Sequence, residues 1–265
     1  MLVNFTKMHG LGNDFIVIDA ISQAIKLSAS QIKKISNRHL GIGCDQVLII
    51  EPPLRPDADF YYRIYNCDGQ EVEQCGNGAR CVARFVVDAG LINKAKVIAD
   101  CLAGRLILSI RNNNLINVDF GCITAKISKY IIDKPNLPTE IYSISLGNPH
   151  GICMIPNIAA IPIAEWGKEL SLLPCFPEQA NITFMQIIDP EHIKLQTFER
   201  GANVTLACGS GACAAVIVGQ HLDMLNQTVT ATFTCGELTI SFDKNSSNLQ
   251  MCGPATSVFI GRFRI

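Results

Sequence analysis

Two segments of the chain are mainly apolar, and each follows a glycine-rich start. They cover residues 79–87 and residues 212–218. Their valines are compatible with strands, but their alanine content and glycine entry favour helices. Gly90 suits the C-terminal cap of the first helix. A helix this apolar has to be buried on nearly all sides, so each should lie inside a core.

Most other apolar segments are short, rich in β-branched or aromatic residues, and separated by Asn, Gly and Asp, which is typical of strands. One polar helix is expected over residues 30–38, with Ser28 or Ser30 as its N-cap. The pattern therefore predicts an α+β fold. The clearest strands are residues 60–65, 106–110, 228–233 and 238–242.

The chain repeats itself once. Residues 75–83 read Cys-Gly-Asn-Gly-Ala-Arg-Cys-Val-Ala, and residues 208–216 read Cys-Gly-Ser-Gly-Ala-Cys-Ala-Ala-Val, so Cys208 follows Cys75 by 133 positions. Gly147-Asn148 follows Gly12-Asn13 by 135 positions. Two matches at nearly one offset predict two similarly folded halves.

We expect each half to be a curled, mainly antiparallel, barrel-like sheet around one central apolar helix, with the active site in the cleft between the halves. The N-terminal half should cover residues 1–118 and be completed by the last strand, at about residues 255–265. The C-terminal half should cover residues 119–254.

The composition of the chain excludes several classes of function. Of the 265 residues, 48% are hydrophobic and 17% are charged, as in a globular protein. The net charge of -1 and the lack of a Lys/Arg cluster argue against nucleic-acid binding and against a polybasic membrane contact. No apolar run approaches the roughly 20 residues of a membrane span, and no signal-peptide pattern is visible, so a cytoplasmic protein is expected.

Two of the twelve cysteines differ from the rest. Most lie among apolar residues, as small buried hydrophobes do. Cys75 and Cys208 instead precede the two predicted helices. There the glycines let a ligand approach the backbone closely, and the free N–H groups of a helix start can bind its carboxylate. The positive electrostatic field at a helix N-terminus also favours the thiolate form of a cysteine. One thiolate would remove an α-proton, and the other thiol would return a proton from the opposite face.

Other roles for these cysteines remain open. Structural zinc is disfavoured because Cys208 and Cys213 would point about 140° apart on a helix. A Cys/His hydrolase would leave the second motif without a role. A Cys75–Cys208 disulfide would be an inactive, oxidised form. A non-catalytic amino-acid-binding or zinc-binding protein is the alternative from another class.

Seven segments identify a family. They are residues 8–15 (Met-His-Gly-Leu-Gly-Asn-Asp-Phe), 41–46 (Gly-Ile-Gly-Cys-Asp-Gln), 66–69 (Asn-Cys-Asp-Gly), 73–80 (Glu-Gln-Cys-Gly-Asn-Gly-Ala-Arg), 147–150 (Gly-Asn-Pro-His), 199–202 (Glu-Arg-Gly-Ala) and 207–212 (Ala-Cys-Gly-Ser-Gly-Ala). With them the chain resembles diaminopimelate epimerases over essentially its whole length. The resemblance implies interconversion of LL- and meso-diaminopimelate for lysine and cell-wall synthesis, without pyridoxal phosphate or metal, by a homodimer.

The resemblance also implies roles for individual residues. Cys75 and Cys208 would be the acid/base pair, with His150 and Glu199 tuning their pKa values. Arg200 suits the distal carboxylate of the substrate. For Asn13 and Asn148 the alternative is a turn residue, and for His150 it is a structural histidine. The substrate-binding set would be Asn13, Gln46, Asn66, Gly76, Asn77, Asn148, Asn181, Glu199, Arg200, Gly209 and Ser210.

The chain departs from the family pattern at a few positions. Asn203-Val204 stands where the family usually has Gly-Glu, Cys67 where alanine is common, and Ser210 where threonine is common. The first departure affects a local loop, while Ser210 still offers a backbone amide. Arg80 is interpreted as a polar contact toward the C-terminal end of its helix. Another cofactor-independent racemase or isomerase, of the proline racemase or phenazine-pathway kind, is the alternative within the fold.

Overall fold

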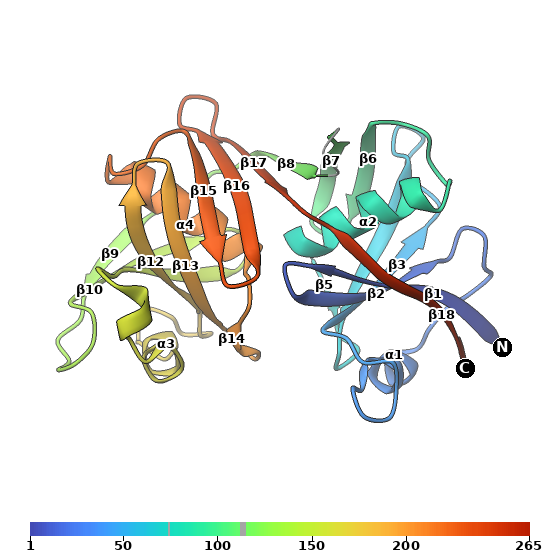
Figure 1. Cartoon of the computed structure of the whole chain (residues 1–265), viewed down its shortest axis with the longest axis horizontal. Coiled ribbons are helices and arrows are strands. Elements are labelled where there is room, and N and C mark those ends of the chain that lie inside the picture. The colour runs from blue at the N-terminus through green and yellow to red at the C-terminus, as the bar shows by residue number, and fades with distance from the viewer. Residues whose placement is uncertain (74, 112–114) are drawn as a thin grey trace. The chain divides into compact units, whose positions relative to one another are not determined.

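The computed structural model describes residues 1–73, 75–111 and 115–265, which divide into two compact units (Figure 1). Unit 1 is Met1–Phe120 with Cys252–Ile265, and unit 2 is Gly121–Met251. The sequence analysis expected the first division after residue 118 and the return of the chain at about residue 255. Each half is described by itself below.

Unit 1 is a curled sheet in which most neighbours are antiparallel. The pairings run β18–β1–β2–β3–β4–β6–β7–β8, with β5 on the far end of β4, and the β2–β3 and β4–β6 pairs are parallel. The elements are β1 (Leu2–Gly10), β2 (Asn13–Asp19), α1 (Ala29–Ser36), β3 (Gln46–Glu51), β4 (Phe60–Asn66), β5 (Glu71–Val72), α2 (Gly76–Asp88), β6 (Lys96–Cys101), β7 (Gly104–Ile110), β8 (Ile116–Cys122) and β18 (Thr256–Arg264).

Unit 2 repeats this plan. Here the parallel pairs are β11–β12 and β13–β15. The elements are β9 (Ser128–Ile131), β10 (Glu140–Ser145), β11 (Pro149–Met154), η1 (Ile158–Ala160), α3 (Ile163–Ser171), β12 (Asn181–Asp189), β13 (His192–Glu199), β14 (Asn203–Thr205), α4 (Gly209–His221), β15 (Thr228–Phe233), β16 (Gly236–Asp243) and β17 (Asn248–Gly253).

The two units correspond element by element. The run β1, β2, α1, β3, β4, β5, α2, β6, β7, β8 matches the run β10, β11, α3, β12, β13, β14, α4, β15, β16, β17 in order and in the sense of the strand pairings given above. The fold class predicted from the sequence, two similar halves with a mainly antiparallel curled sheet around an apolar helix, is confirmed, and the sheet is not closed.

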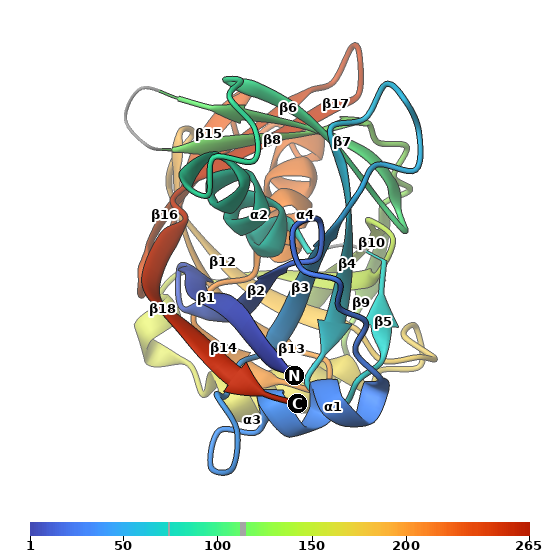
Figure 2. The same cartoon turned by 90° about the vertical axis from the view of Figure 1, so that its right-hand side faces the viewer.

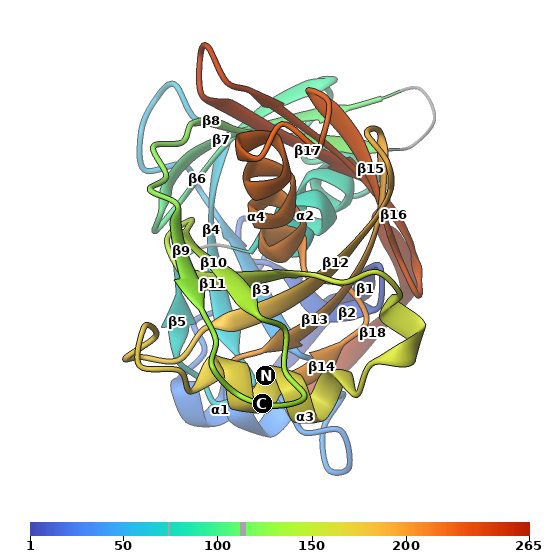
Figure 3. The ribbon, with the colours of Figure 1, turned by 90° about the vertical axis from the view of Figure 1, so that its left-hand side faces the viewer.

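A long apolar helix lies inside each curled sheet. Figure 2 looks onto unit 1 and shows α2 against β1, β2 and β7, and Figure 3 looks onto unit 2 with α4 against β11, β12 and β16. In α4 every residue except Ser210 and His221 is buried. In α2 the apolar face is buried, and the helix ends at Asp88, with Gly90 at φ +68° as the glycine of the C-terminal turn.

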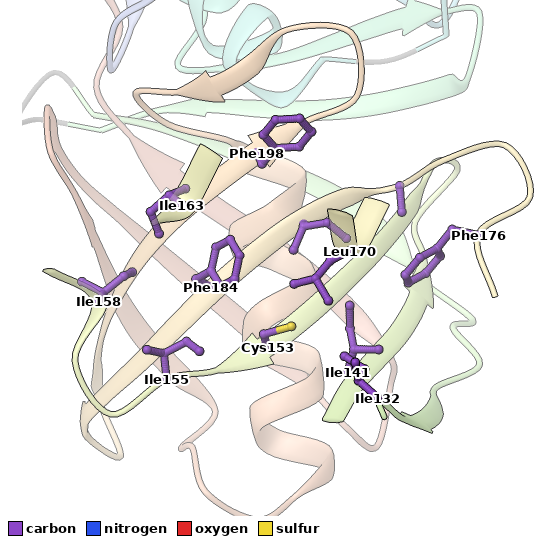
Figure 4. Close-up of a cluster of buried hydrophobic side chains, with 12 residues drawn as sticks. Ile132, Ile141, Cys153, Ile155, Ile158, Ile163, Leu170, Phe176, Phe184 and Phe198 are labelled. Atoms are coloured by element: carbon purple, nitrogen blue, oxygen red, sulfur yellow. The ribbon is translucent and has the colours of Figure 1, made fainter. Parts of the chain in front are cut away.

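The smaller helices cover the outside of the sheets. The predicted polar helix is α1, which Ser28 caps together with the Gln31 side chain, and it ends at Ser36, before the predicted residue 38. The sequence analysis missed α3. This helix packs on β12 and β13 over a second core that contains Phe184 and Leu170 (Figure 4). None of the helices in the described residues is long and apolar enough to cross a membrane.

Candidate active site

Cys75 forms the start of α2. It is the N-cap residue, with extended backbone (φ -146°, ψ 110°), and its Sγ accepts a hydrogen bond from the Gly78 N–H at 3.4 Å. The thiol is half-buried, so it keeps access to small molecules. The predicted arrangement, a cysteine in front of a glycine-rich helix start, is therefore present in unit 1.

Two predicted substrate-binding amides lie beside this thiol. Asn13 begins β2 directly after a turn in which Leu11 and Gly12 both have positive φ. Its Oδ1 lies 3.8 Å from the Cys75 Sγ and accepts a hydrogen bond from the Asn77 Nδ2 at 3.2 Å. Unit 1 thus brings Asn13, Cys75 and Asn77 together from segments more than 60 residues apart.

Gln46 and Asn66 form a second predicted pair in unit 1. They face each other across the β3–β4 ladder, and the Gln46 Nε2 donates to the Asn66 Oδ1 at 2.9 Å. The Gln46 Oε1 is buried and has no hydrogen-bond partner among the described residues. A buried acceptor of this kind is costly to leave unpaired, so it suits a donor group of a ligand.

Cys208 occupies the corresponding position in unit 2. It is the N-cap of α4 (φ -120°, ψ 108°), it is only 4% exposed, and its Sγ lies 3.6 Å from the Ser210 Oγ. A Cβ at Gly211 would approach the Cys208 Sγ to 3.3 Å and the Thr183 Oγ1 to 2.7 Å. The close packing at this helix start therefore requires glycine at position 211.

At Cys208 burial affects the pKa of the thiol more strongly than the helix start does. Burial raises the pKa of Cys208 well above the usual value of a thiol, and the Glu199 carboxylate raises this pKa further. The hydrogen bonds from Ser210 and from the Gly211 N–H lower the pKa but do not compensate. The expectation that the helix start favours a thiolate is thus wrong for Cys208, which is held as a neutral thiol at neutral pH.

Glu199 and His150 were both expected to tune the cysteines. Glu199 ends β13, accepts a hydrogen bond from the Thr205 Oγ1 at 2.5 Å, and also bonds to Cys208. His150 is fully buried, its Nε2 lies 3.0 Å from the Asn148 Oδ1, and burial lowers its pKa to about 4. The ring is therefore neutral at neutral pH, and its described contact is with Asn148.

Asn181, at the start of β12, contacts Arg200, which lies in the β13–β14 turn. The Asn181 Oδ1 accepts a hydrogen bond from the Arg200 backbone N–H at 2.9 Å, and the exposed Arg200 side chain donates from Nη1 to the Glu178 carbonyl at 2.9 Å. In the same turn, Asn203 has φ +62°. Asparagine tolerates this conformation better than most residues, which explains how it replaces the usual glycine.

The site residues of the two units correspond in pairs. Phe15 pairs with Gln46 in the β2–β3 register, and His150 pairs with Asn181 in the β11–β12 register, so His150 takes the place of Phe15. The same alignment matches four further pairs. They are Asn13 with Asn148, Gln46 with Asn181, Asn66 with Glu199, and Cys75 with Cys208.

Two residues that the sequence analysis did not place in the site belong to its surroundings. The Asp45 Oδ2 accepts a hydrogen bond from the Asn13 Nδ2 at 2.9 Å. Arg80 is fully buried and reaches back to the Asn77 Oδ1 at 2.9 Å and the Gly76 carbonyl at 3.4 Å. The expected contact toward the C-terminal end of the helix is wrong, because helical side chains point toward the N-terminus.

No three His, Cys, Asp or Glu side chains gather as ligands within the ranges that the structure describes.

Solved structures that share this fold include a phenazine biosynthesis protein, an epimerase and an isomerase. A phenazine biosynthesis protein of the PhzF family from Bacillus anthracis is 16% identical with a TM-score of 0.77, and all of both chains is covered. A hydroxyproline epimerase from Agrobacterium vitis is 14% identical (TM-score 0.72, 98% of this chain and 92% of that chain). A methylitaconate-delta-isomerase is 12% identical (TM-score 0.63, 99% and 95%). Identities this low establish the fold alone.

The chain is an enzyme of the isomerase class, because it matches the profile of a family of epimerases over both halves. The sequence profile of the family described as "Diaminopimelate epimerase" matches residues 5–125 and 142–258, in both halves of the chain. The chain therefore belongs to the diaminopimelate epimerase family, and the resemblance inferred from the sequence is confirmed.

The environment of Cys208 yields a pair of opposite predictions. Glu199→Gln removes a charge that raises the pKa of Cys208, so this pKa should fall. Ser210→Ala removes a hydrogen bond that lowers the pKa, so it should rise. We expect the rate of Cys208 alkylation by iodoacetamide at fixed pH to change by about threefold or more in opposite directions, since one pKa unit is tenfold. Peptide mass spectrometry measures this rate.

Glu191→Gln, at an exposed carboxylate of unit 2, is the control and should leave the Cys208 rate unchanged. Shifts of the same sign in Glu199→Gln and Ser210→Ala would contradict the electrostatic account.

Proposed function

We propose that this enzyme interconverts LL- and meso-diaminopimelate without a cofactor, in lysine and cell-wall precursor synthesis, with Cys75 and Cys208 as the acid/base pair. The observation that supports the proposal most is the duplicated helix start. Each unit presents one cysteine as the N-cap of a buried helix. Three residues later comes a glycine, Gly78 or Gly211, where a Cβ would approach Leu48 to 3.2 Å in unit 1 and Thr183 to 2.7 Å in unit 2. Membership of the family supports the same reaction.

In the proposed mechanism the α-carboxylate of the substrate binds to the first backbone N–H groups of α2 and α4. Gly76-Asn77 in unit 1 and Gly209-Ser210 in unit 2 supply these amides. The same amides stabilise the negative charge that spreads onto the carboxylate when the α-proton leaves. Anion binding and stabilisation of the transition state thus use one set of donors.

The proton transfers require one thiolate and one thiol. The thiolate removes the α-proton and becomes a thiol, while the other thiol protonates the opposite face of the carbon and becomes a thiolate. The pair ends in the reverse protonation state, which is the state required for the reverse reaction. Glu199 and the buried surroundings favour the protonated form of Cys208. We propose that His150 acts on the pair indirectly, by orienting Asn148.

The distal amino-acid end of the substrate suits the remaining predicted polar residues, which are Gln46, Asn66, Asn181 and Arg200. Arg200 uses one nitrogen on the Glu178 carbonyl, and its guanidinium has five N–H donors in all, so it retains donors for a carboxylate. The unpaired Gln46 Oε1 suits an ammonium donor. We assign Asn66 and Asn181 to the same end, because they hydrogen-bond to Gln46 and to the Arg200 backbone.

The two-thiol chemistry is tested by cysteine variants. We expect Cys75→Ala and Cys208→Ala each to lose about 10²–10⁴-fold in epimerisation rate, the usual contribution of a general acid or base. Solvent deuterium should enter the α-position of diaminopimelate in the wild type, measured by mass spectrometry.

The matched control is Cys81→Ala, which alters a fully buried cysteine of α2 away from the helix start and should keep most of the activity. Near-wild-type epimerisation by either Cys75→Ala or Cys208→Ala would refute the two-thiol mechanism. A lack of deuterium uptake in the wild type would favour a non-catalytic binding protein.

The substrate assignment is tested at Arg200. Arg200→Met removes a charge-assisted hydrogen bond worth about 1.5–3 kcal/mol, so KM for diaminopimelate should rise at least about tenfold. Lysine, which lacks the distal carboxylate, should be a poor substrate for the wild type, and its turnover should change little in the variant. Steady-state kinetics with both substrates measures the difference.

Lys194→Met, at an exposed position of the same strand β13, is the control for the loss of a positive charge. Equal turnover of lysine, proline or hydroxyproline and diaminopimelate by the wild type would overturn the substrate assignment but leave the two-thiol mechanism intact.

We also propose that the enzyme is a homodimer, and the surface of β18 supports a second copy as the partner. Val258, Phe259 and Ile260 are consecutive and 55%, 49% and 81% exposed. Neighbouring strand residues point to opposite faces, so apolar surface is uncovered on both faces of β18.

Ile260→Asp should therefore shift the enzyme toward a monomer in sedimentation velocity. Val204→Asp, at an exposed apolar residue of unit 2, is the control and should sediment as the wild type does. A monomeric wild type would contradict the proposal.

A further inference from the structure

A chain of hydrogen bonds in unit 1 joins two arginines through the amide beside Cys75. The Arg38 Nη2 donates to the Asp45 Oδ1 at 2.8 Å, and the Asp45 Oδ2 accepts from the Asn13 Nδ2 at 2.9 Å. The Asn13 Oδ1 accepts from the Asn77 Nδ2 at 3.2 Å, and the Asn77 Oδ1 accepts from the Arg80 Nη2 at 2.9 Å. These hydrogen bonds link three separate segments of the sequence to the start of α2.

The ends of this chain fix the orientation of both amides. A guanidinium only donates and a carboxylate only accepts hydrogen bonds. Asn77 must therefore turn its oxygen toward Arg80, and Asn13 must turn its nitrogen toward Asp45. Rotating either amide by 180° would set donor against donor or acceptor against acceptor. Each side chain is left with one favourable orientation.

The fixed orientation determines what faces the thiol. With the Asn13 nitrogen held by Asp45, it is the Asn13 carbonyl oxygen that lies 3.8 Å from the Cys75 Sγ. An oxygen acceptor stabilises the S–H form and disfavours the thiolate, whereas the Gly78 N–H at 3.4 Å stabilises the thiolate. Cys75 thus lies between one contact that favours its neutral form and one that favours its charged form.

We propose that Asp45 is a positioning residue for the epimerase reaction. It holds the Asn13 carbonyl toward Cys75, and Arg80 supports this arrangement at the other end of the series of hydrogen bonds. Asp45 acts through Asn13 and not by touching the substrate. The inference rests on the proposed function in that Cys75 exchanges a proton with the substrate. Its consequence is that Asp45 biases Cys75 toward the thiol form, against the helix start.

Other titratable groups near this thiol stay in one state. Burial raises the pKa of Tyr62, on β4, well above its usual value, and raises that of Cys81, on α2, to about 12. Burial also acts on Asp14, beside Asp45, but hydrogen bonds from Arg38 and Lys7 outweigh it and hold the pKa of Asp14 far below its usual value. Arg80 and Arg38 stay charged. Alkylation measured on the peptide that carries Cys75 follows this thiol between about pH 6 and 10.

The test uses Asp45→Ala and the alkylation of Cys75 by iodoacetamide, followed by peptide mass spectrometry over this pH range. Without Asp45, Asn13 loses its anchor and the thiol loses an ordered acceptor. The pH midpoint of alkylation should therefore move down, so that the rate near neutral pH rises about threefold or more. Asp45 is a partly exposed residue of a loop, and thermal unfolding monitors whether the variant is folded.

A double-mutant cycle separates positioning from a general structural effect. In an Asn13→Ala background, adding Asp45→Ala should cause no further shift, because the residue through which Asp45 acts is already missing. Asp19→Ala, at the opposite end of β2, removes a carboxylate that bonds only to its own turn among the described residues and should leave the midpoint unchanged.

An unchanged midpoint in Asp45→Ala, or an equal shift with and without Asn13, would overturn the inference. Alkylation needs no substrate, so this outcome is distinct from failure of the proposed function, which would appear as full epimerase activity in Cys75→Ala.

Discussion

The structure depends on two helices that are buried on nearly all sides inside curled sheets. Burying α2 and α4 stabilises each unit through apolar contact, but it also encloses their first N–H groups, which have no partners within the helix. In unit 1 the Cys75 side chain satisfies the Gly78 N–H. In unit 2 Cys208 is likewise the N-cap residue, but its side chain makes no capping hydrogen bond, and its Sγ lies 3.6 Å from the Ser210 Oγ. The N-cap residues of the two buried helices are therefore also the residues of the candidate chemistry.

Duplication explains why the candidate site residues recur, and the differences between the copies explain their chemistry. The position of Asn66 in unit 1 is Glu199 in unit 2, so only Cys208 has a carboxylate at that position. The position of Phe15 is His150, which bonds to Asn148, whereas Asn13 is bonded to Asp45. The two units thus share one architecture, but the charges near their thiols differ. The equivalent asparagines, Asn13 and Asn148, are also held by different side chains.

The sequence predicted the parts that depend on local pattern. The two apolar helices, the capped polar helix at Ser28 and the cysteine helix starts follow from periodicity, capping residues and the repeat. The helix α3 was missed because its nine residues carry no clear start signal; Pro162 is its N-cap and makes no side-chain bond. The hydrogen bond between Asn13 and Asp45 joins residues that are 32 positions apart, and no spacing in the sequence predicts it.

The pKa of Cys208 shows a different limit, because a motif does not reveal how much water reaches it. The helix start at Gly209 was correctly predicted, yet burial and Glu199 reverse its effect on the thiol. The two-thiol mechanism proposed above needs one thiol and one thiolate at the start of each turnover. Two identical environments would leave the choice to chance, whereas a deeply buried sulfur next to a carboxylate retains its proton. In the proposed mechanism, the asymmetry between the duplicated halves therefore favours Cys208 as the protonated member of the pair.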